Sequence, residues 1–191
     1  MRAIILDGWM GNGRRFERLR RCLEGGGVEA VIWTYDNTGR RDLGIVAGEL
    51  LATLMKGKGL VHLVGYSMGG LVVREALRQG PDVPIGSATF IHVPHQGTRL
   101  AHLLPLPGVR QLRPGNPFLE RLAGQHWHWP TLNIWCPGDL MVVPGWRSRW
   151  EGDGRNQVCR VPAHVWPIYS DFWHQKISAF IRSVAGGVEI E

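Results

Sequence analysis

One serine of this sequence has the surroundings of an enzymatic nucleophile. The segment 65–69, GYSMG, fits the pattern G-x-S-x-G, with Ser67 at its centre. It lies where the apolar run 60–64 gives way to a helix-like segment that starts at Met68. A sharp turn there would lift the Ser67 hydroxyl above a sheet, and the flanking glycines would let the backbone crowd together. The alternative is a glycine-rich turn with an incidental serine, but the strand before it and the helix after it favour a nucleophile.

Two later residues could activate Ser67, because a serine hydroxyl needs a base and the base needs an orienting acid. Asp139 follows the apolar run 131–136 on a Pro-Gly turn, and we expect it to be the acid, although Pro-Gly-Asp is also ordinary turn composition. His164 follows the short apolar run 158–161, which predicts it as the base. The chain order Ser, Asp, His is the one expected when such residues follow successive strands.

Three other residues compete for these roles. Asp153 sits in a glycine turn, but it precedes the last predicted strand rather than following one. His174 lies inside a helical pattern, which is typical of a surface or packing histidine. His62 lies within an apolar run, and we expect a core histidine whose hydrogen bonds are satisfied.

Backbone N–H groups near Ser67 could hold the negative charge that develops on a carbonyl oxygen under attack. The Met68 N–H directly follows the serine, at the positive end of the predicted helix. The loop 6–13, LDGWMGNG, follows the first strand and predicts the Trp9 N–H as the second donor. The side chains of Trp9 and Met68 would then form walls of the site.

These residues need a scaffold, and short apolar runs alternate along the chain with segments of helical length. The predicted strands are 3–6, 28–33, 60–64, 88–93, 131–136 and 158–161, and the predicted helices are 16–23, 43–55, 68–78, 118–122 and 171–184. Continuous rather than alternating apolar runs indicate burial on both faces. We therefore predict an α/β architecture, a mostly parallel sheet of about six strands with helices on both faces.

Residues 95–130 break this alternation, because they hold no clear strand and are rich in Pro, Gly and Leu. We expect a short lid-like excursion over the site, within a single domain that spans residues 1–191. Five apolar residues of this stretch could line the site or cover the core: Leu100, Leu103, Leu104, Leu106 and Val109. Four tryptophans flank predicted loops, where they serve either a lipid interface or simple packing: Trp127, Trp129, Trp146 and Trp150.

The composition of the 191 residues, 44% hydrophobic and 20% charged, is that of a soluble globular protein. No apolar run reaches the roughly 18 residues of a membrane span, and no signal peptide is visible. We therefore expect a cytoplasmic protein, or a secreted one if a leader was removed. The net charge of +6 is spread out, and its densest group, in 14–21, has glutamates interspersed. This group predicts a solvated helix face rather than a nucleic-acid site, and attraction to anionic surfaces stays open.

Neither a disulfide framework nor a metal site stands out. The three cysteines, Cys22, Cys136 and Cys159, lack C-x-x-C spacing, and free buried thiols are favoured over a pair between Cys136 and Cys159. His126 and His128 have a spacing that can bind a metal, but no third ligand is identifiable. We expect neither a metal nor an organic cofactor.

Together these segments resemble the α/β-hydrolase fold and, within it, small bacterial lipases and esterases related to triacylglycerol lipases and to GPI inositol-deacylase-like hydrolases. The resemblance rests on LDGWMGNG, GYSMGGLVVREAL, IHVPHQGTRLA, LRPGNPFLERL, CPGDLMVVP and PAHVWPIYSDFWHQKISAFI. It implies Ser67 as nucleophile, Asp139 as acid, His164 as base, and the backbone N–H groups of Trp9 and Met68 as the oxyanion hole. It also implies a minimal form of the fold, without a large cap and without the two N-terminal strands of larger members.

Asp7 departs from the family pattern, which has a histidine before this glycine. A carboxylate near an oxyanion hole would oppose the developing negative charge. We therefore expect Asp7 to point away from the hole into a hydrogen bond if Trp9 is an oxyanion donor.

The resemblance implies a serine carboxylic-ester hydrolase that acts on short to medium acyl esters through an acyl-enzyme intermediate. Other acyl-transfer uses of the same residues stay open, namely a thioesterase, an amidase or an acyltransferase. A non-catalytic binding protein of the same fold is a third hypothesis. We expect the partner to be a small-molecule acyl ester or a lipid, and we expect no binding to nucleic acid. Transient contact with a lipid interface stays open, and the sequence makes no prediction of the oligomeric state.

Overall fold

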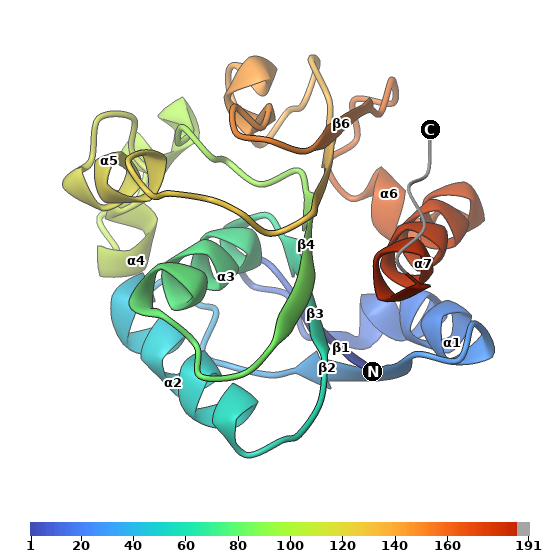
Figure 1. Cartoon of the computed structure of the whole chain (residues 1–191). Helices are drawn as coiled ribbons and strands as arrows, with labels where there is room; N and C mark the ends of the chain where they lie inside the picture. Colours follow the sequence, from blue (N-terminus) through green and yellow to red (C-terminus); the bar gives the residue numbers. More distant parts are fainter. Residues whose placement is uncertain (187–191) are drawn as a thin grey trace.

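The described part of the chain, residues 1–186 of this computed structural model, builds one sheet of six parallel strands (Figure 1). The order across the sheet is β2-β1-β3-β4-β5-β6. The strands are β1 (Arg2–Leu6), β2 (Glu29–Trp33), β3 (Val61–Tyr66), β4 (Ile85–Ile91), β5 (Thr131–Trp135) and β6 (Arg155–Val158). The predicted sheet of about six mostly parallel strands is therefore confirmed.

Burial explains why continuous apolar runs form the middle of this sheet. β3 is buried along its whole length, and β1 and β4 are buried at every residue but the first. A strand covered on both faces needs apolar side chains at every position, not at alternate ones. β4 ends at Ile91, two residues earlier than predicted, because His92 leaves the strand with a φ of 48°.

The last strand is where the sequence prediction is wrong. The apolar run 158–161 was expected to be the strand, but β6 covers Arg155–Val158. β6 is the edge of the sheet and is largely exposed, so its position is not marked by an apolar run. Its register depends on polar contacts instead, since Asn156 lies opposite Asn133 of β5 and accepts a side-chain hydrogen bond from it at 2.9 Å.

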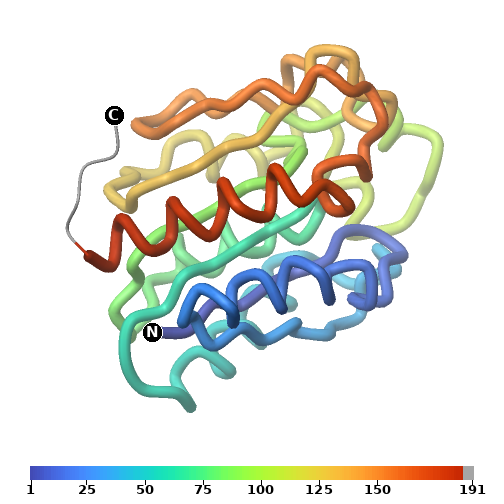
Figure 2. The backbone as a smooth tube through the Cα atoms, turned by 90° about the vertical axis from the view of Figure 1, so that its right-hand side faces the viewer, coloured from blue at the N-terminus to red at the C-terminus, as the bar shows by residue number. Residues whose placement is uncertain are grey.

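Helices cover both faces of the sheet, as predicted (Figures 1 and 2). One face carries α2 (Leu43–Met55), α3 (Met68–Gln79), α4 (Pro107–Arg110) and α5 (Pro117–Ala123), and the other carries α1 (Glu17–Gly25), α6 (Trp166–Tyr169) and α7 (Asp171–Gly186). Three short 3₁₀ turns complete the elements: η1 (Arg14–Phe16), η2 (Arg99–His102) and η3 (Gly145–Ser148). A separate cluster of buried apolar side chains lies under each layer of helices.

Local signals account for where several helices begin. Asp42 caps α2 by accepting a hydrogen bond from the Gly44 N–H at 2.7 Å. Asn116 caps α5 in the same way through the Phe118 N–H at 2.9 Å, with proline at the first helical position. α4, α5 and η2 all belong to residues 95–130, so this stretch folds as short helices beside the sheet.

The strand order reverses between β1 and β3, and this reversal positions the functional residues. The chain passes from β1 outward to β2 and then returns across β1 to β3, so the connections on either side of this point lie on opposite faces. The loops after β1 and β3 therefore diverge and leave a crevice at the carboxyl edge of the sheet. The first of these loops contains Trp9, and the second contains Ser67.

Other sequence expectations can be compared with the described residues. Cys22, Cys136 and Cys159 are free thiols, and the last two are buried. Within residues 14–21, Arg18 pairs with Asp171, and Arg20 pairs with Glu17 and Glu24, which agrees with a solvated helix face. Among residues 1–186, no helix has the length and apolar character needed to cross a membrane.

The turn between β3 and α3 is unusually tight. Ser67 has φ 50° and ψ −125°, a conformation that residues with side chains rarely adopt. Gly65 makes the turn possible, because a Cβ at this position would lie 2.4 Å from the Cα of Gly70. Backbone meets backbone there, so no flexible side chain can move to relieve the contact.

We therefore expect Gly65→Ala to destabilise the protein by about 1–3 kcal/mol, the usual cost of overpacking. Gly25→Ala is the matched control, because a Cβ at this last residue of α1 meets nothing within 4 Å. That substitution should leave stability unchanged or raise it by up to about 1 kcal/mol. Urea unfolding of the two variants measures both effects, and equal stabilities would show that the turn is not constrained in this way.

Candidate active site

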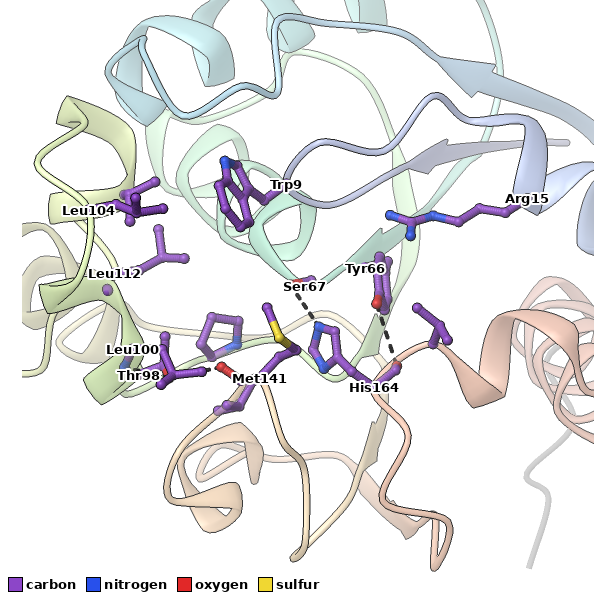
Figure 3. Close-up of a pocket in the computed structure, with 15 residues that line it drawn as sticks. Trp9, Arg15, Tyr66, Ser67, Thr98, Leu100, Leu104, Leu112, Met141 and His164 are labelled. Carbon is purple, nitrogen blue, oxygen red and sulfur yellow. Dashed lines mark hydrogen bonds between the residues drawn. The ribbon is translucent and has the colours of Figure 1, made fainter.

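The three residues that the sequence singles out for catalysis lie in one hydrogen-bonded row. His164 Nε2 lies 3.0 Å from Ser67 Oγ (Figure 3). On its other side, His164 Nδ1 lies 2.7 Å from Asp139 Oδ2. Ser67 follows β3, Asp139 follows β5 and His164 follows β6, so all three sit at the carboxyl edge of the sheet. The distances are those of a nucleophile, a base and an orienting acid.

Asp139 is held firmly in this row. Its side chain is buried, and its second oxygen, Oδ1, accepts hydrogen bonds from the N–H groups of Met141 at 2.7 Å and Val142 at 2.9 Å. Burial alone would raise the pKa of Asp139, but the hydrogen bond from His164 and the close approach of His92 outweigh it and hold the pKa well below its usual range. Asp139 therefore stays ionised at neutral pH.

The pKa of His164 is also lowered, which for a histidine favours the neutral form. Burial disfavours its charged form and lowers its pKa below the usual 6.5, although the Asp139 carboxylate partly offsets this. The imidazole is therefore neutral at pH 7. With its Nδ1 proton donated to Asp139, its Nε2 is left free to accept a proton from Ser67.

His92 is a functional candidate that the sequence analysis missed. It is fully buried, and its Nδ1 lies 3.0 Å from Asp139 Oδ2, the same oxygen that His164 contacts, though off the line of a hydrogen bond. Burial opposes its charge, but Asp139 and the Cys159 thiol beside it raise the pKa of His92. The available signal was its place directly after β4, at the same edge of the sheet as the other three residues.

Asp7 does not face the catalytic row as a free charge. Its carboxylate accepts hydrogen bonds from the N–H groups of Gly8 at 2.6 Å and Gly13 at 3.0 Å, and it forms an ion pair with Arg15. The Tyr35 hydroxyl donates to its carbonyl oxygen at 2.6 Å. The Asp7 carboxylate is thus hydrogen-bonded within the loop after β1, and the positive charge of Arg15 compensates its negative charge.

The two backbone N–H groups expected to form an oxyanion hole are unengaged. Met68 is the first residue of α3, and Trp9 lies in the loop after β1. Neither N–H donates to an acceptor within residues 1–186. The Trp9 indole is fixed by a 2.9 Å hydrogen bond from its Nε1 to the Thr38 carbonyl, and it forms a wall of the site, whereas the Met68 side chain is buried in the core.

A cavity of about 260 Å³ opens beside Ser67 and His164. One end is apolar, with Trp9, Leu104 and Leu112 around it, and Tyr66 and Arg15 lie on the other side of Ser67 (Figure 3). Of the five apolar residues left open in 95–130, three line this cavity, Leu106 packs against the core and Leu103 is exposed. The three that line it are Leu100, Leu104 and Val109.

The rival residues lie elsewhere. His62 is buried in β3, and its Nδ1 lies 2.8 Å from the Ser87 hydroxyl. Its Nε2 has no hydrogen-bond partner within the described residues, so only one of its two ring nitrogens is hydrogen-bonded as expected. His174 packs inside α7 and bonds the Ile168 carbonyl at 2.7 Å. Asp153 and its turn stand outside the cavity lining.

Trp127 and Trp150 are buried against Phe90, which favours the packing role, whereas Trp146 is half exposed.

One group of side chains within residues 1–186 has the convergence that a metal ion needs. His92, Asp139 and His164 place their ligand atoms within 4.8 Å of one another. The contacts of Asp139 Oδ2 with His164 Nδ1 at 2.7 Å and with His92 Nδ1 at 3.0 Å account for this convergence. His126 and His128, whose rings lie 6.2 Å apart, belong to no three-residue group in the described chain.

Comparison with known proteins gives likenesses of structure only. No family profile and no curated protein sequence matches the chain. Among solved structures, a pyrethroid hydrolase from Sphingobium faniae JZ-2 has a TM-score of 0.68 at 16% identity, over 97% of this chain and 99% of that one. An esterase from Exiguobacterium antarcticum has a TM-score of 0.66 at 13% identity, over 96% and 92%.

Aspergillus fumigatus lipase B has a TM-score of 0.66 at 18% identity. The match covers 93% of this chain but 49% of the lipase, so the chain spans about half the length of that protein. At such identities a likeness establishes architecture and not activity. The sheet order, the helices on both faces and these neighbours together show that the chain has the α/β-hydrolase fold.

Proposed function

We propose that the protein is a serine carboxylic-ester hydrolase. The observation that carries this proposal is the hydrogen-bonded row from Ser67 through His164 to Asp139, placed beside an apolar cavity. The naming of three structural neighbours as an esterase, a lipase and a pyrethroid hydrolase supports the same class of reaction.

The reaction proceeds in two stages. Ser67 Oγ attacks the ester carbonyl while His164 Nε2 takes its proton, and Asp139 stabilises the imidazolium that forms. The backbone N–H groups of Trp9 and Met68 hold the oxyanion, aided by the positive end of α3. His164 then protonates the departing alcohol, and water hydrolyses the acyl-enzyme by the reverse sequence of proton transfers.

The cavity sets the substrate class that we propose. Its lining is mostly apolar, so it favours an alkyl chain, with about 0.8 kcal/mol gained for each buried methylene. Its volume of about 260 Å³ lies just under the roughly 300–1,000 Å³ of typical ligand pockets. We therefore infer that the acyl group is short to medium in length and lies in the end formed by Trp9, Leu104 and Leu112.

A series of p-nitrophenyl esters from acetate to palmitate tests this proposal. The wild-type protein should hydrolyse the short and medium esters best, and Ser67→Ala should lower kcat by about a thousandfold or more, since it removes the nucleophile. Ser183→Ala is the matched control, because Ser183 lies on α7 and bonds the Phe180 carbonyl. A folded Ser67→Ala variant with wild-type activity would refute the assignment of Ser67, and a wild type inactive on every ester would refute the substrate class.

The pH dependence of kcat/KM should report the proton on His164. A base must be neutral to act, so activity is lost as the pH falls through the pKa of His164, which burial places below the usual 6.5. We expect the midpoint of the acid limb below pH 6.5. Measurement of initial rates from pH 4 to 9 gives this midpoint.

His92→Asn provides a second measurement for the same prediction. A protonated His92 near His164 lowers the pKa of His164 by repulsion, so its replacement by a neutral residue should move the acid limb to higher pH. A variant that only weakened the packing would lower the rate without moving the limb. An acid limb above pH 6.5 in the wild type would contradict the account of His164.

A further inference from the structure

Exposed apolar side chains lie around the mouth of the cavity beside Ser67. Six of them, which we call the rim, are Met10, Leu103, Leu140, Met141, Val165 and Trp166. Each rim residue either lines the cavity or directly adjoins in the chain a residue that lines it. Trp9, Leu104 and His164 are such neighbours, and they lie on different sides of Ser67 (Figure 3). The rim therefore borders the mouth from several directions.

The rim is assembled from four loops that leave the sheet at its carboxyl edge. These loops follow β1, β4, β5 and β6, and they lie together on the right of Figure 2. Leu103 and Leu140, from two of these loops, are 76% and 70% exposed. Three further exposed apolar side chains come from the same loops: Trp146, Val161 and Tyr169. Single exposed apolar residues are ordinary, but such a group around one opening marks an interaction surface.

The charged side chains of these loops are positive wherever they are exposed. Taken from the end of each strand through the short helices that follow it, the loops comprise residues 7–16, 92–110, 136–148 and 159–169. Their carboxylates are those of Asp7 and Asp139, and both are buried and bonded to other side chains. Four of their arginines are exposed and form no ion pair within residues 1–186: Arg14, Arg99, Arg110 and Arg160.

The carboxylates that border these loops do not cancel this positive charge. Glu17 and Asp171 are each paired with an arginine of α1. The loop after β2, residues 34–42, holds two aspartates and two arginines, so it adds no net charge. The acidic residues of 151–153 directly precede β6 and so lie toward the opposite edge of the sheet. The carboxyl edge is therefore an apolar rim with unpaired positive charges around it.

A second copy of this chain and a nucleic acid are the competing partners for such a surface. Two rims that faced each other would bring like charges together, which opposes a dimer through this surface. A nucleic acid would bind the arginines through its phosphates, but this binding requires no exposed apolar side chains between them. A lipid surface with acidic headgroups matches both features, because its phosphates attract arginine and its acyl region takes up apolar side chains.

We propose that the rim and the four unpaired arginines form a docking surface for a bilayer that contains anionic phospholipids. The rim enters the boundary between headgroups and acyl chains, which suits the apolar ring and polar N–H of Trp166. The cavity then opens toward the lipid. Docking does not rest on the function proposed above, because it needs neither Ser67 nor an ester.

Sedimentation of the full-length protein with lipid vesicles tests the proposal. One set of vesicles contains phosphatidylcholine mixed with phosphatidylserine, and the other contains phosphatidylcholine alone. We expect saturable binding to the first set at low ionic strength, weaker binding at high salt, and little binding to the second set. Equal binding to both sets, or binding to neither, would overturn the proposal.

Variants locate the binding on the rim. Leu103→Ser combined with Leu140→Ser should weaken binding several-fold at low and at high salt, because salt does not screen the burial of apolar surface. Arg99→Gln and Arg160→Gln should each weaken binding by about fivefold at low salt and much less at high salt.

The matched controls are exposed residues toward the opposite edge of the sheet. Met55→Ser, at the end of α2, removes an apolar side chain, and Arg155→Gln, at the start of β6, removes one positive charge. Both controls should bind vesicles as the wild type does, and rim variants that bind equally well would overturn the proposal. Self-association, or binding of a DNA duplex, that the rim variants abolish in a protein that ignores vesicles would overturn it in favour of that partner.

Discussion

The backbone of Ser67 imposes the constraint on which the rest of the site depends. Its positive φ forces the chain to turn within a single residue from β3 into α3, which points the hydroxyl away from the core and places a helix N-terminus behind it. Such a conformation costs about 1–3 kcal/mol and persists only where the surrounding structure enforces it. Here the surrounding structure is close-packed backbone, with Gly65 against Gly70.

The same kind of strain recurs around this centre. Among residues 1–186, the non-glycine residues with positive φ are Met10, Ser67 and His92. Each follows a strand of the sheet interior, β1, β3 or β4, at the carboxyl edge. Met10 is the residue after Trp9, whose N–H group is unengaged, and the His92 side chain lies 3.0 Å from Asp139. Residues with positive φ thus lie at the carboxyl edge of the sheet, at or beside the point where the strand order reverses and a crevice opens.

Electrostatic compensation allows two buried carboxylates to lie near the site at which the proposed reaction would develop an anion. The charge of Asp139 is stabilised by the histidines on either side of it and by two backbone N–H donors. Asp7 is neutralised by Arg15 and turned into its own loop. The expectation that Asp7 must point into hydrogen bonds if Trp9 is a donor is met. The Asp7 carboxylate binds the N–H groups of Gly8 and Gly13, and the Trp9 N–H donates to no acceptor among residues 1–186.

Some of this architecture is visible in the sequence, and some is not. Ser67 and Asp139 each follow a buried apolar run, so their positions at one edge of the sheet could be predicted. β6 could not, because an edge strand is set by pairing with β5 and carries no apolar run. The ion pair of Asp7 with Arg15 and the approach of His92 to Asp139 depend on tertiary packing, since each looks like an ordinary polar position in its own segment.

Covalent labelling with a fluorophosphonate, followed by mass spectrometry of the peptides, tests the central claim most directly. The reagent needs an activated serine and no knowledge of the natural substrate. The account predicts one phosphonylated residue, Ser67, with labelling abolished in Ser67→Ala and strongly slowed in His164→Ala. A folded wild-type protein that leaves Ser67 unlabelled, or labels it as fast in His164→Ala as in the wild type, would contradict the claim that His164 activates this serine.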